Sequence, residues 1–215
     1  MKFKHLASLI IVLLAGFFLW LTGDGHYREL SDHLKHLLLE NLVSLDSGPA
    51  PERFDAAYIM GGDNRAQGFK YHAASEIYQE GLCDKFLFMS VEGRDRYSTE
   101  MARNYTRDEL TALKLERAGV DKATIMPISI RKGPFGTMNE ARSVIDFVKK
   151  NHYRNVLVIA APYHSRRVRL SFSSFAGNDG LEIKIFGSGE HVRLKELLFE
   201  FMKLKLYGLL MLFYA

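Results

Sequence analysis

The chain is poor in cysteine, and its charges of either sign are not gathered into long runs. Its 215 residues contain one cysteine, Cys83, so no disulfide can form within the chain and a zinc site built from several thiolates is excluded. Lysine and arginine outnumber aspartate and glutamate only slightly, for a net charge of +4. The basic residues form no stripe interleaved with aromatic side chains, so nucleic-acid binding is not expected.

Several fingerprints of common enzymes are also missing. The sequence has no Gly-x-Gly-x-x-Gly turn, P-loop, Gly-x-Ser-x-Gly elbow or His-Glu-x-x-His helix. It shows no internal repeat and no low-complexity segment. No cofactor is therefore named by a motif, and no group of residues is spaced like a metal site.

One long uncharged stretch is present, at residues 6–23. As a helix rising about 1.5 Å per residue it would cover roughly 27 Å, enough to cross the hydrocarbon core of a bilayer. Lys2 and Lys4 precede it, so the positive-inside rule keeps residues 1–5 in the cytoplasm. Small residues are poorly placed for cleavage, which favours an uncleaved transmembrane signal anchor over a cleaved signal peptide. We expect a single-pass protein of the inner membrane whose main domain lies on the periplasmic or extracellular side.

Residues 24–53 are expected to form an amphipathic helix followed by a linker. Leucines recur at helical spacing between Leu30 and Leu45, and charged residues fill the opposite face. Pro49 and Pro51 end the helix. The sequence leaves open whether this helix packs on the following domain or along the membrane surface.

From residue 54 to 215, short apolar segments alternate with longer helical ones. This alternation predicts an α/β domain, with a Rossmann-like parallel sheet of about five strands flanked by helices. The expected strands are 56–60, 85–90, 124–127, 156–161 and 182–186. The expected helices are 67–80, 99–118, 137–151, 165–175 and 192–211. The last helix should pack on the sheet, with contact to the bilayer surface as the alternative.

Ligands of open parallel sheets bind beyond the carboxyl ends of the strands, so the segments after each strand are the candidate site. After the first strand, Gly61 and Gly62 would let the backbone approach a ligand, and Arg65 would bind phosphate or carboxylate. A tight turn explains the same residues without a ligand. After the second strand, the charged segment 90–100 is long enough to form a lid.

The segments after the third and fourth strands carry the strongest candidates. Thr137 and Glu140 have the spacing of a capping box, which would explain both without a function. His164 is followed by Arg166 and Arg167, which should lower its pKa and keep the imidazole neutral. We therefore predict that His164 is the catalytic acid or base and that the arginines bind an anion.

These segments together resemble the YdcF/SanA/ElyC-like family of bacterial envelope proteins. The resemblance extends over roughly residues 54–207. Its matching segments are Gly61-Gly62, 70–73 (KYHA), 78–81 (YQEG), Gly119-Val120, 137–141 (TMNEA), 162–167 (PYHSRR), and 200–204 (EFMKL) with Tyr207. The Tyr-His-x-Arg-Arg element is the most specific of them.

The resemblance implies a Rossmann-like domain, often with an N-terminal anchor, that acts in envelope integrity or in cell-wall or surface-polysaccharide biogenesis. It adds Asn139 and Tyr163 to the expected ligand site. It also implies an acidic residue near the start of the helix after the second strand, where Glu100, Asp108 and Glu109 all fit. The predicted function is to bind or process a phosphorylated or nucleotide-like small molecule. The alternative is a non-catalytic envelope factor or sensor that acts through protein partners.

Overall fold

A computed structural model describes residues 12–16, 28–46, 53–62, 64–99, 101–177, 180–190 and 192–214, without the side chains of 28–30, 64, 65 and 212–214. Across these described ranges, no helix is both long enough and apolar enough to cross a membrane. The anchor predicted at 6–23 lies outside the described residues, apart from a short helical segment at 12–16.

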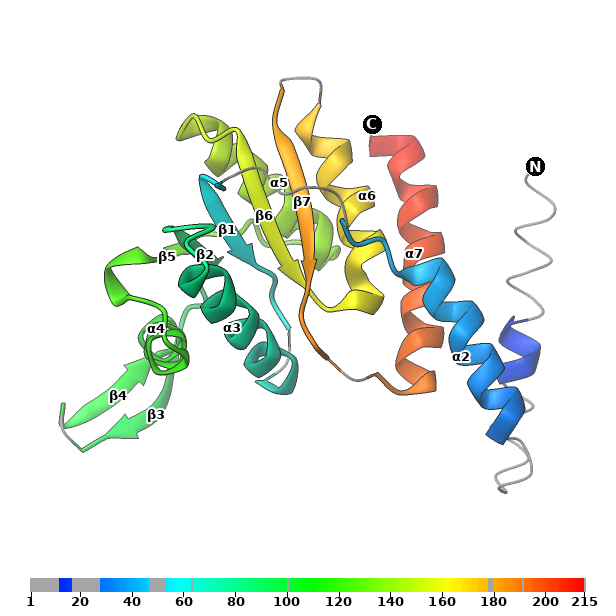
Figure 1. The fold of residues 1–215 in the computed structure, drawn as a ribbon, viewed down its shortest axis with the longest axis horizontal. Coiled ribbons are helices and arrows are strands. Elements are labelled where there is room, and N and C mark those ends of the chain that lie inside the picture. The colour runs from blue at the N-terminus through cyan, green and yellow to red at the C-terminus, as the bar shows by residue number, and fades with distance from the viewer. Residues whose placement is uncertain are drawn as a thin grey trace.

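Five parallel strands form the central sheet, in the order β5-β2-β1-β6-β7 (Figure 1). They are β1 (Ala56–Ile59), β2 (Phe86–Met89), β5 (Ile125–Ile128), β6 (Asn155–Ala160) and β7 (Glu182–Gly187). The first strand, β1, is the central one. Strands β2 and β5 follow on one side of it, and β6 and β7 lie on the other side. The predicted Rossmann-like α/β fold is thus confirmed. The reversal of strand order between β1 and β6 opens a crevice at their carboxyl ends.

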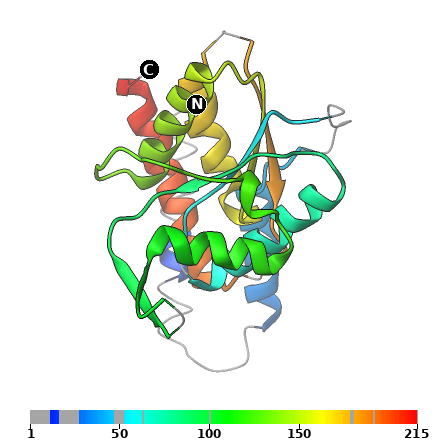
Figure 2. The same cartoon turned by 90° about the vertical axis from the view of Figure 1, so that its left-hand side faces the viewer.

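Two layers of helices cover the sheet, as Figure 2 shows with the sheet seen near its edge. They are α3 (Asn64–Gln79) and α4 (Arg107–Ala118) on one face, and α5 (Gly136–Lys150) and α6 (Ser165–Ala176) on the other. Strand side chains alternate between the faces. Ala57 and Ile59 of β1 pack in the core under α3 and α4, whereas Ala56 and Tyr58 pack in the core under α5 and α6.

The last helix, α7 (Leu194–Tyr214), does not pack on the sheet, so that prediction was wrong. It lies against α6 and against the amphipathic helix α2 (Arg28–Leu42), because α6 already covers that side of β6 and β7 (Figure 1). Leu197 and Phe201 of α7 share a buried cluster with Leu38 and Leu42 of α2. The amphipathic helix therefore packs on the domain.

Polar contacts fix the chain between α2 and the sheet. Arg169 of α6 forms an ion pair with Asp46 at 2.6 Å, and the Ser44 amide donates to Ser165 Oγ at 2.7 Å. The Asp46 carboxylate also accepts a hydrogen bond from the Ile185 amide of β7 at 2.7 Å. Residues 43–46 are thus attached both to the edge of the sheet and to the helix that follows β6.

The helix predicted at 99–118 starts later than expected. Strand β4 (Arg103–Thr106) lies in its first part and forms, with β3 (Arg94–Ser98), a hairpin that projects from the body of the domain (Figure 1). Thr106 and Glu109 form a complete capping box at the start of α4: the Glu109 amide donates to Thr106 Oγ1, and the Thr106 amide donates to Glu109 Oε2. Because this box fixes the first turn, α4 begins at Arg107.

Candidate functional site

Three adjoining cavities lie at the carboxyl ends of the strands. The central cavity, of about 80 Å³, lies at the reversal of strand order between β1 and β6. The α3–α4 cavity has about 400 Å³ and meets it at Gly61, and the α5 cavity has about 580 Å³ and meets it at Glu140. The lining of the central cavity includes Gly61, Lys70, Thr137, Glu140, His164 and Arg167. Five of the ten predicted site residues, Gly61, Thr137, Glu140, His164 and Arg167, therefore meet at this cavity.

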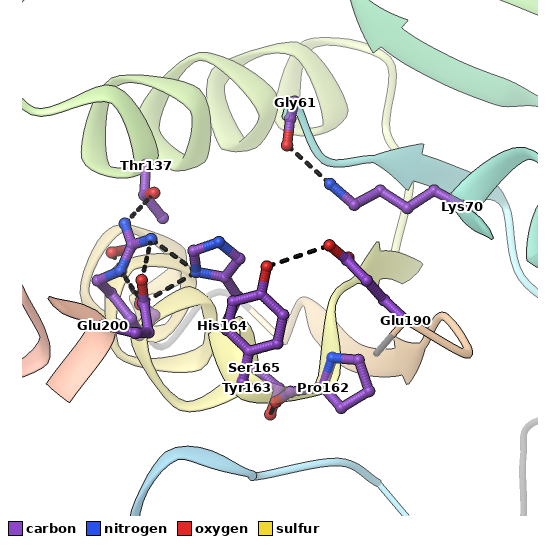
Figure 3. Close-up of polar contacts among 11 residues, drawn as sticks. Gly61, Lys70, Thr137, Pro162, Tyr163, His164, Ser165, Glu190 and Glu200 are labelled. Atoms are coloured by element: carbon purple, nitrogen blue, oxygen red, sulfur yellow. Dashed lines mark hydrogen bonds and ion pairs between the residues drawn. The ribbon is translucent and has the colours of Figure 1, made fainter. Parts of the chain in front are cut away.

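His164 is positioned by the short helix η3 (Pro162–His164), which turns the chain from β6 into α6. Its Nδ1 lies 2.8 Å from Arg167 Nη2 and 2.9 Å from Glu200 Oε1. Tyr163 packs beside it, with ring centroids 4.7 Å apart. The other ring nitrogen, Nε2, has no hydrogen-bond partner in the described part of the chain and points into the space below Gly61 (Figure 3).

The pKa of His164 is lowered, as predicted, but the main cause differs. Burial is the largest influence, and it is partly offset by Glu200, whose hydrogen bond and charge raise the pKa. Arg167 and Lys70 lower it further. Arg166, the other arginine expected to lower this pKa, is exposed on α6 and does not line the central cavity. At neutral pH His164 is therefore uncharged and able to accept a proton.

Arg167 links three helices from within the protein. Its Nε and Nη2 donate to the two oxygens of Glu200 on α7, and its Nη1 donates to Thr137 Oγ1 on α5. Its guanidinium also lies over the ring of Tyr207, 5.0 Å from the centroid. These protein acceptors occupy the guanidinium, so Arg167 positions His164 and Glu200 instead of presenting free donors to an anion.

Glu200 is 2% exposed and remains ionised. Burial by itself would raise the pKa of this carboxyl. The hydrogen bonds from His164 and Arg167 outweigh burial and hold the pKa below its usual value.

The capping box predicted for Thr137 and Glu140 was wrong. Helix α5 begins at Gly136 after Phe135, which makes no side-chain cap, and Thr137 lies within the first turn. Glu140 instead accepts hydrogen bonds from the Gly61 amide at 3.2 Å and from the Tyr58 hydroxyl at 3.3 Å. Both side chains point toward buried donors of neighbouring elements, which leaves the first amides of α5 without a side-chain acceptor.

A buried lysine stands opposite Glu140. Lys70 of α3 is 1% exposed, and its Nζ donates to the carbonyls of Met60 at 3.0 Å and Gly61 at 2.8 Å (Figure 3). Burial raises the pKa of Glu140, although the Gly61 amide, Lys70 and Tyr58 each act to lower it. Burial thus raises the pKa of Glu140 and lowers that of His164, so it favours the uncharged form of both groups.

Close approach explains the two glycines after β1. A Cβ at Gly61 would lie 2.7 Å from Glu140 Oε1, and one at Gly62 would lie 2.9 Å from Lys70 Nζ. A side chain at Gly61 would displace Glu140, and one at Gly62 would displace Lys70. The two glycines are therefore explained by the space that these buried side chains need, and not by a tight turn alone. The side chain of Arg65 lies outside the described residues.

The remaining predicted residues border the site. The Tyr163 hydroxyl donates to Glu190 Oε1 at 3.1 Å, and burial together with Glu190 raises the pKa of this phenol (Figure 3). Asn139 lines the α5 cavity, and its Nδ2 is buried without a hydrogen-bond partner. A Cβ at Gly133 would lie 2.6 Å from that nitrogen.

Among the acidic candidates near α4, Asp108 accepts hydrogen bonds from Ser90 Oγ at 2.6 Å and from the Val91 amide at 2.9 Å. It thereby holds the chain that leaves β2 at the edge of the site. Glu109 belongs to the capping box of α4, and Glu100 lies outside the described residues.

Sequence reasoning missed Lys70 and Glu200 as site residues. A signal for both was present in the helical pattern. Lys70 falls on the apolar face that Ala66, Ala74 and Ile77 define, and Glu200 falls between Leu197 and Phe201 on α7. A charged residue on an apolar helix face must be paired inside the protein.

The search of family models found no match for this sequence, and neither did the search of curated proteins. Across the described residues, no group of three or more histidine, cysteine, aspartate or glutamate side chains is arranged to hold a metal ion.

Proposed function

We propose that the chain is a membrane-anchored α/β protein of the bacterial envelope. It binds a phosphorylated or nucleotide-like small molecule, and His164 processes it, in cell-wall or surface-polysaccharide biogenesis. The observation that carries the proposal is the meeting of His164, Lys70 and Glu140 at one cavity, where the strand order of the sheet reverses. Ligands of Rossmann-like sheets bind at this place.

The anion is received mainly by α5. A complete capping box supplies acceptors to backbone amides in the first turn of α4. Helix α5 begins beside the α5 cavity, and its N-terminus has no side-chain cap. The buried Nδ2 of Asn139 adds a donor to the same cavity. Uncapped amides at a helix N-terminus and an amide nitrogen suit a phosphate or carboxylate.

His164 transfers the proton. We assign the Nδ1 hydrogen to the bond with ionised Glu200, so Nδ1 does not accept from Arg167 Nη2, which donates to Glu200 Oε2. The lone pair of Nε2 is then directed into the central cavity. Arg167 balances the charge of Glu200 and fixes its orientation. Glu140, whose pKa is raised, is the partner acid across the cavity.

Two features support placing the domain against a membrane. The uncharged run 6–23 precedes it in the sequence. Helix α7 also exposes an apolar row flanked by lysines: Phe199, Met202, Leu206 and Leu209, with Lys195 and Lys203. A bilayer surface suits such a face.

The anchor is tested by charge insertion. Leu13→Arg combined with Leu14→Arg should release the chain from the membrane fraction, because each arginine in the centre of a span costs about 2.5–3.5 kcal/mol. The measurement is recovery after an alkaline carbonate wash, together with the mass of the wild-type chain. Leu37→Arg, at an exposed leucine of α2, is the matched control and should stay with the membrane. A wild-type chain that is shortened at its N-terminus, or released by the wash, would contradict the anchor.

Ligand binding is tested by thermal unfolding of the full chain with inorganic phosphate, pyrophosphate and a nucleoside diphosphate. At a hundred times its dissociation constant, a bound probe should raise Tm by about 5–11 °C. His164→Asn should keep this shift but lose roughly 10²–10⁴-fold of any turnover of the probe, because it removes the proton-transfer group. Arg166→Ala, at the exposed neighbour, should change neither. The proposal fails if no probe shifts Tm, and binding without turnover by wild type would favour the sensor.

A further inference from the structure

The α3–α4 cavity is larger than the central cavity and has a different lining. It shares Gly61 with the central cavity and extends from there between α3 and α4. Buried apolar side chains of Ile59, Phe88 and Tyr71 form part of its wall. A ligand seated at His164 can therefore continue along Gly61 into a second chamber with an apolar side.

One face of α4 brings positive charge to this chamber. Arg107, Thr111 and Lys114 are spaced i, i+4 and i+7, so they share one helix face, and all line the cavity. Tyr71 of α3 lies on the same wall as Thr111. Among the lining residues that the structure describes, Asp95 of the hairpin is the one carboxylate, beside the two cations of α4.

These two cations differ from other basic residues of the domain. Arg103, Arg131 and Arg169 each form an ion pair with a carboxylate at 2.6 or 2.7 Å. The side chains of Arg107 and Lys114 have neither an ion pair nor a hydrogen bond with the residues that the structure describes. Lys114 is partly withdrawn from solvent and Arg107 is exposed, and both belong to the lining of the cavity.

We propose that the α3–α4 cavity binds a second anionic group of the ligand, held by Arg107 and Lys114. The ligand is then a molecule with two anionic groups, phosphate or carboxylate, joined by an apolar or planar segment that lies along Ile59 and Phe88. One group occupies the site near His164 and the other occupies the α4 face. This inference rests on the proposed function, because it takes the first anion as bound at the site near His164.

Alkanediol bisphosphates with four, six or eight carbons are suitable probes, compared with alkyl monophosphates of the same length and with inorganic phosphate. They are titrated against the full chain by calorimetry. At least one bisphosphate should bind tenfold or more tightly than its monophosphate, since a charge-assisted bond is worth about 1.5–3 kcal/mol. Arg107→Ala and Lys114→Ala should each remove roughly tenfold of that advantage and leave inorganic phosphate unaffected.

Arg117→Ala is the matched control, because it removes the same charge from α4 at an exposed residue that does not line the cavity. It should leave the bisphosphate advantage intact. The inference is overturned if phosphate binds but no bisphosphate is preferred, or if the three variants behave alike. If neither phosphate nor any other probe binds, the proposed function itself fails, which is a different result.

Discussion

Replacing Glu200 with glutamine is expected to lower the free energy of unfolding by about 3–5 kcal/mol, the usual cost of removing one partner from a buried ion pair. Glutamine keeps the size of the side chain but leaves the guanidinium of Arg167, which is 7% exposed, without its counter-charge. It also removes the charged acceptor beside His164 Nδ1. For a chain of this size the loss corresponds to roughly 6–20 °C in Tm. Urea and thermal unfolding of the full chain measure it.

Glu116→Gln is the control for this change, because Glu116 is exposed on α4 and its variant should alter stability by less than about 0.5 kcal/mol. The double variant Arg167→Met/Glu200→Gln should lose less than the sum of the single variants, because the unpaired buried charge is then gone. Equal effects of the Glu200 and Glu116 variants would show that the Arg167–Glu200 pair does not hold α6 to α7.

The same pair should make the domain sensitive to acid. The pKa of Glu200 is lowered in the folded state, so its stabilisation is complete above the unfolded value of about 4.3 and is lost as pH falls through the folded pKa. The lowered pKa of His164 acts in the same direction, starting below about pH 6.5. Glu140 acts in the opposite direction, because its raised pKa favours the protonated folded state. Glu200→Gln should therefore flatten the loss of stability at low pH.

The sheet was predictable because its strands are buried on both faces and read as continuous apolar segments. All five strands lie within two residues of their predicted bounds, and the alternation of strands with helices was sufficient to infer a parallel Rossmann-like sheet. The hairpin at 94–106 was not predicted, because its residues are mostly charged and exposed and carry no apolar pattern. Only the capping box at Thr106 marked the true start of α4.

The candidate site was predictable in its position but not in its connections. The topology of the sheet brings the segments after β1, β5 and β6 to one edge, so Gly61, Thr137 and His164 could be named as candidates from their positions after predicted strands. The partners of these residues come from helix faces, where a charged residue is normally solvated. The role of Arg167 in positioning followed only once Glu200 on α7 was seen to occupy its guanidinium.

Buried charges surround His164 on two sides, and this arrangement is costly for stability. Arg167 and Glu200 lie on the Nδ1 side, and Lys70 and Glu140 line the cavity on the other side. Replacing such groups with apolar residues often stabilises a protein, so stability alone does not explain them. Their common effect is to set the charge and orientation of the imidazole, which is the expected property of a site that transfers protons.

Replacing the buried Lys70 is expected to have a large effect on stability. Lys70→Met keeps most of the side-chain volume but removes the donor to the Met60 and Gly61 carbonyls and the positive charge that lowers the pKa of Glu140. We expect a loss of about 3–5 kcal/mol in the free energy of unfolding, because buried acceptors and a carboxyl group lose their partner together. Lys122→Met, at an exposed lysine, should change stability by less than about 0.5 kcal/mol.

Glu140→Gln, alone and together with Lys70→Met, completes a double-mutant cycle. Glutamine can still accept from Tyr58 and from the Gly61 amide, and it removes a carboxylate whose ionisation burial disfavours, so stability should hold or rise at neutral pH. Combined with Lys70→Met, it should raise the free energy of unfolding by more than Glu140→Gln does in the wild-type background, because it removes the carboxyl group that Lys70→Met leaves without its counter-charge. Ligand binding and proton transfer are measured separately, by the Tm shift with phosphate and by turnover of the probe. Glu140→Gln should keep the Tm shift and lose turnover, as expected for a proton donor. If the stability changes of the two single variants simply add in the double variant, Lys70 and Glu140 act independently and the proposed coupling between them is contradicted.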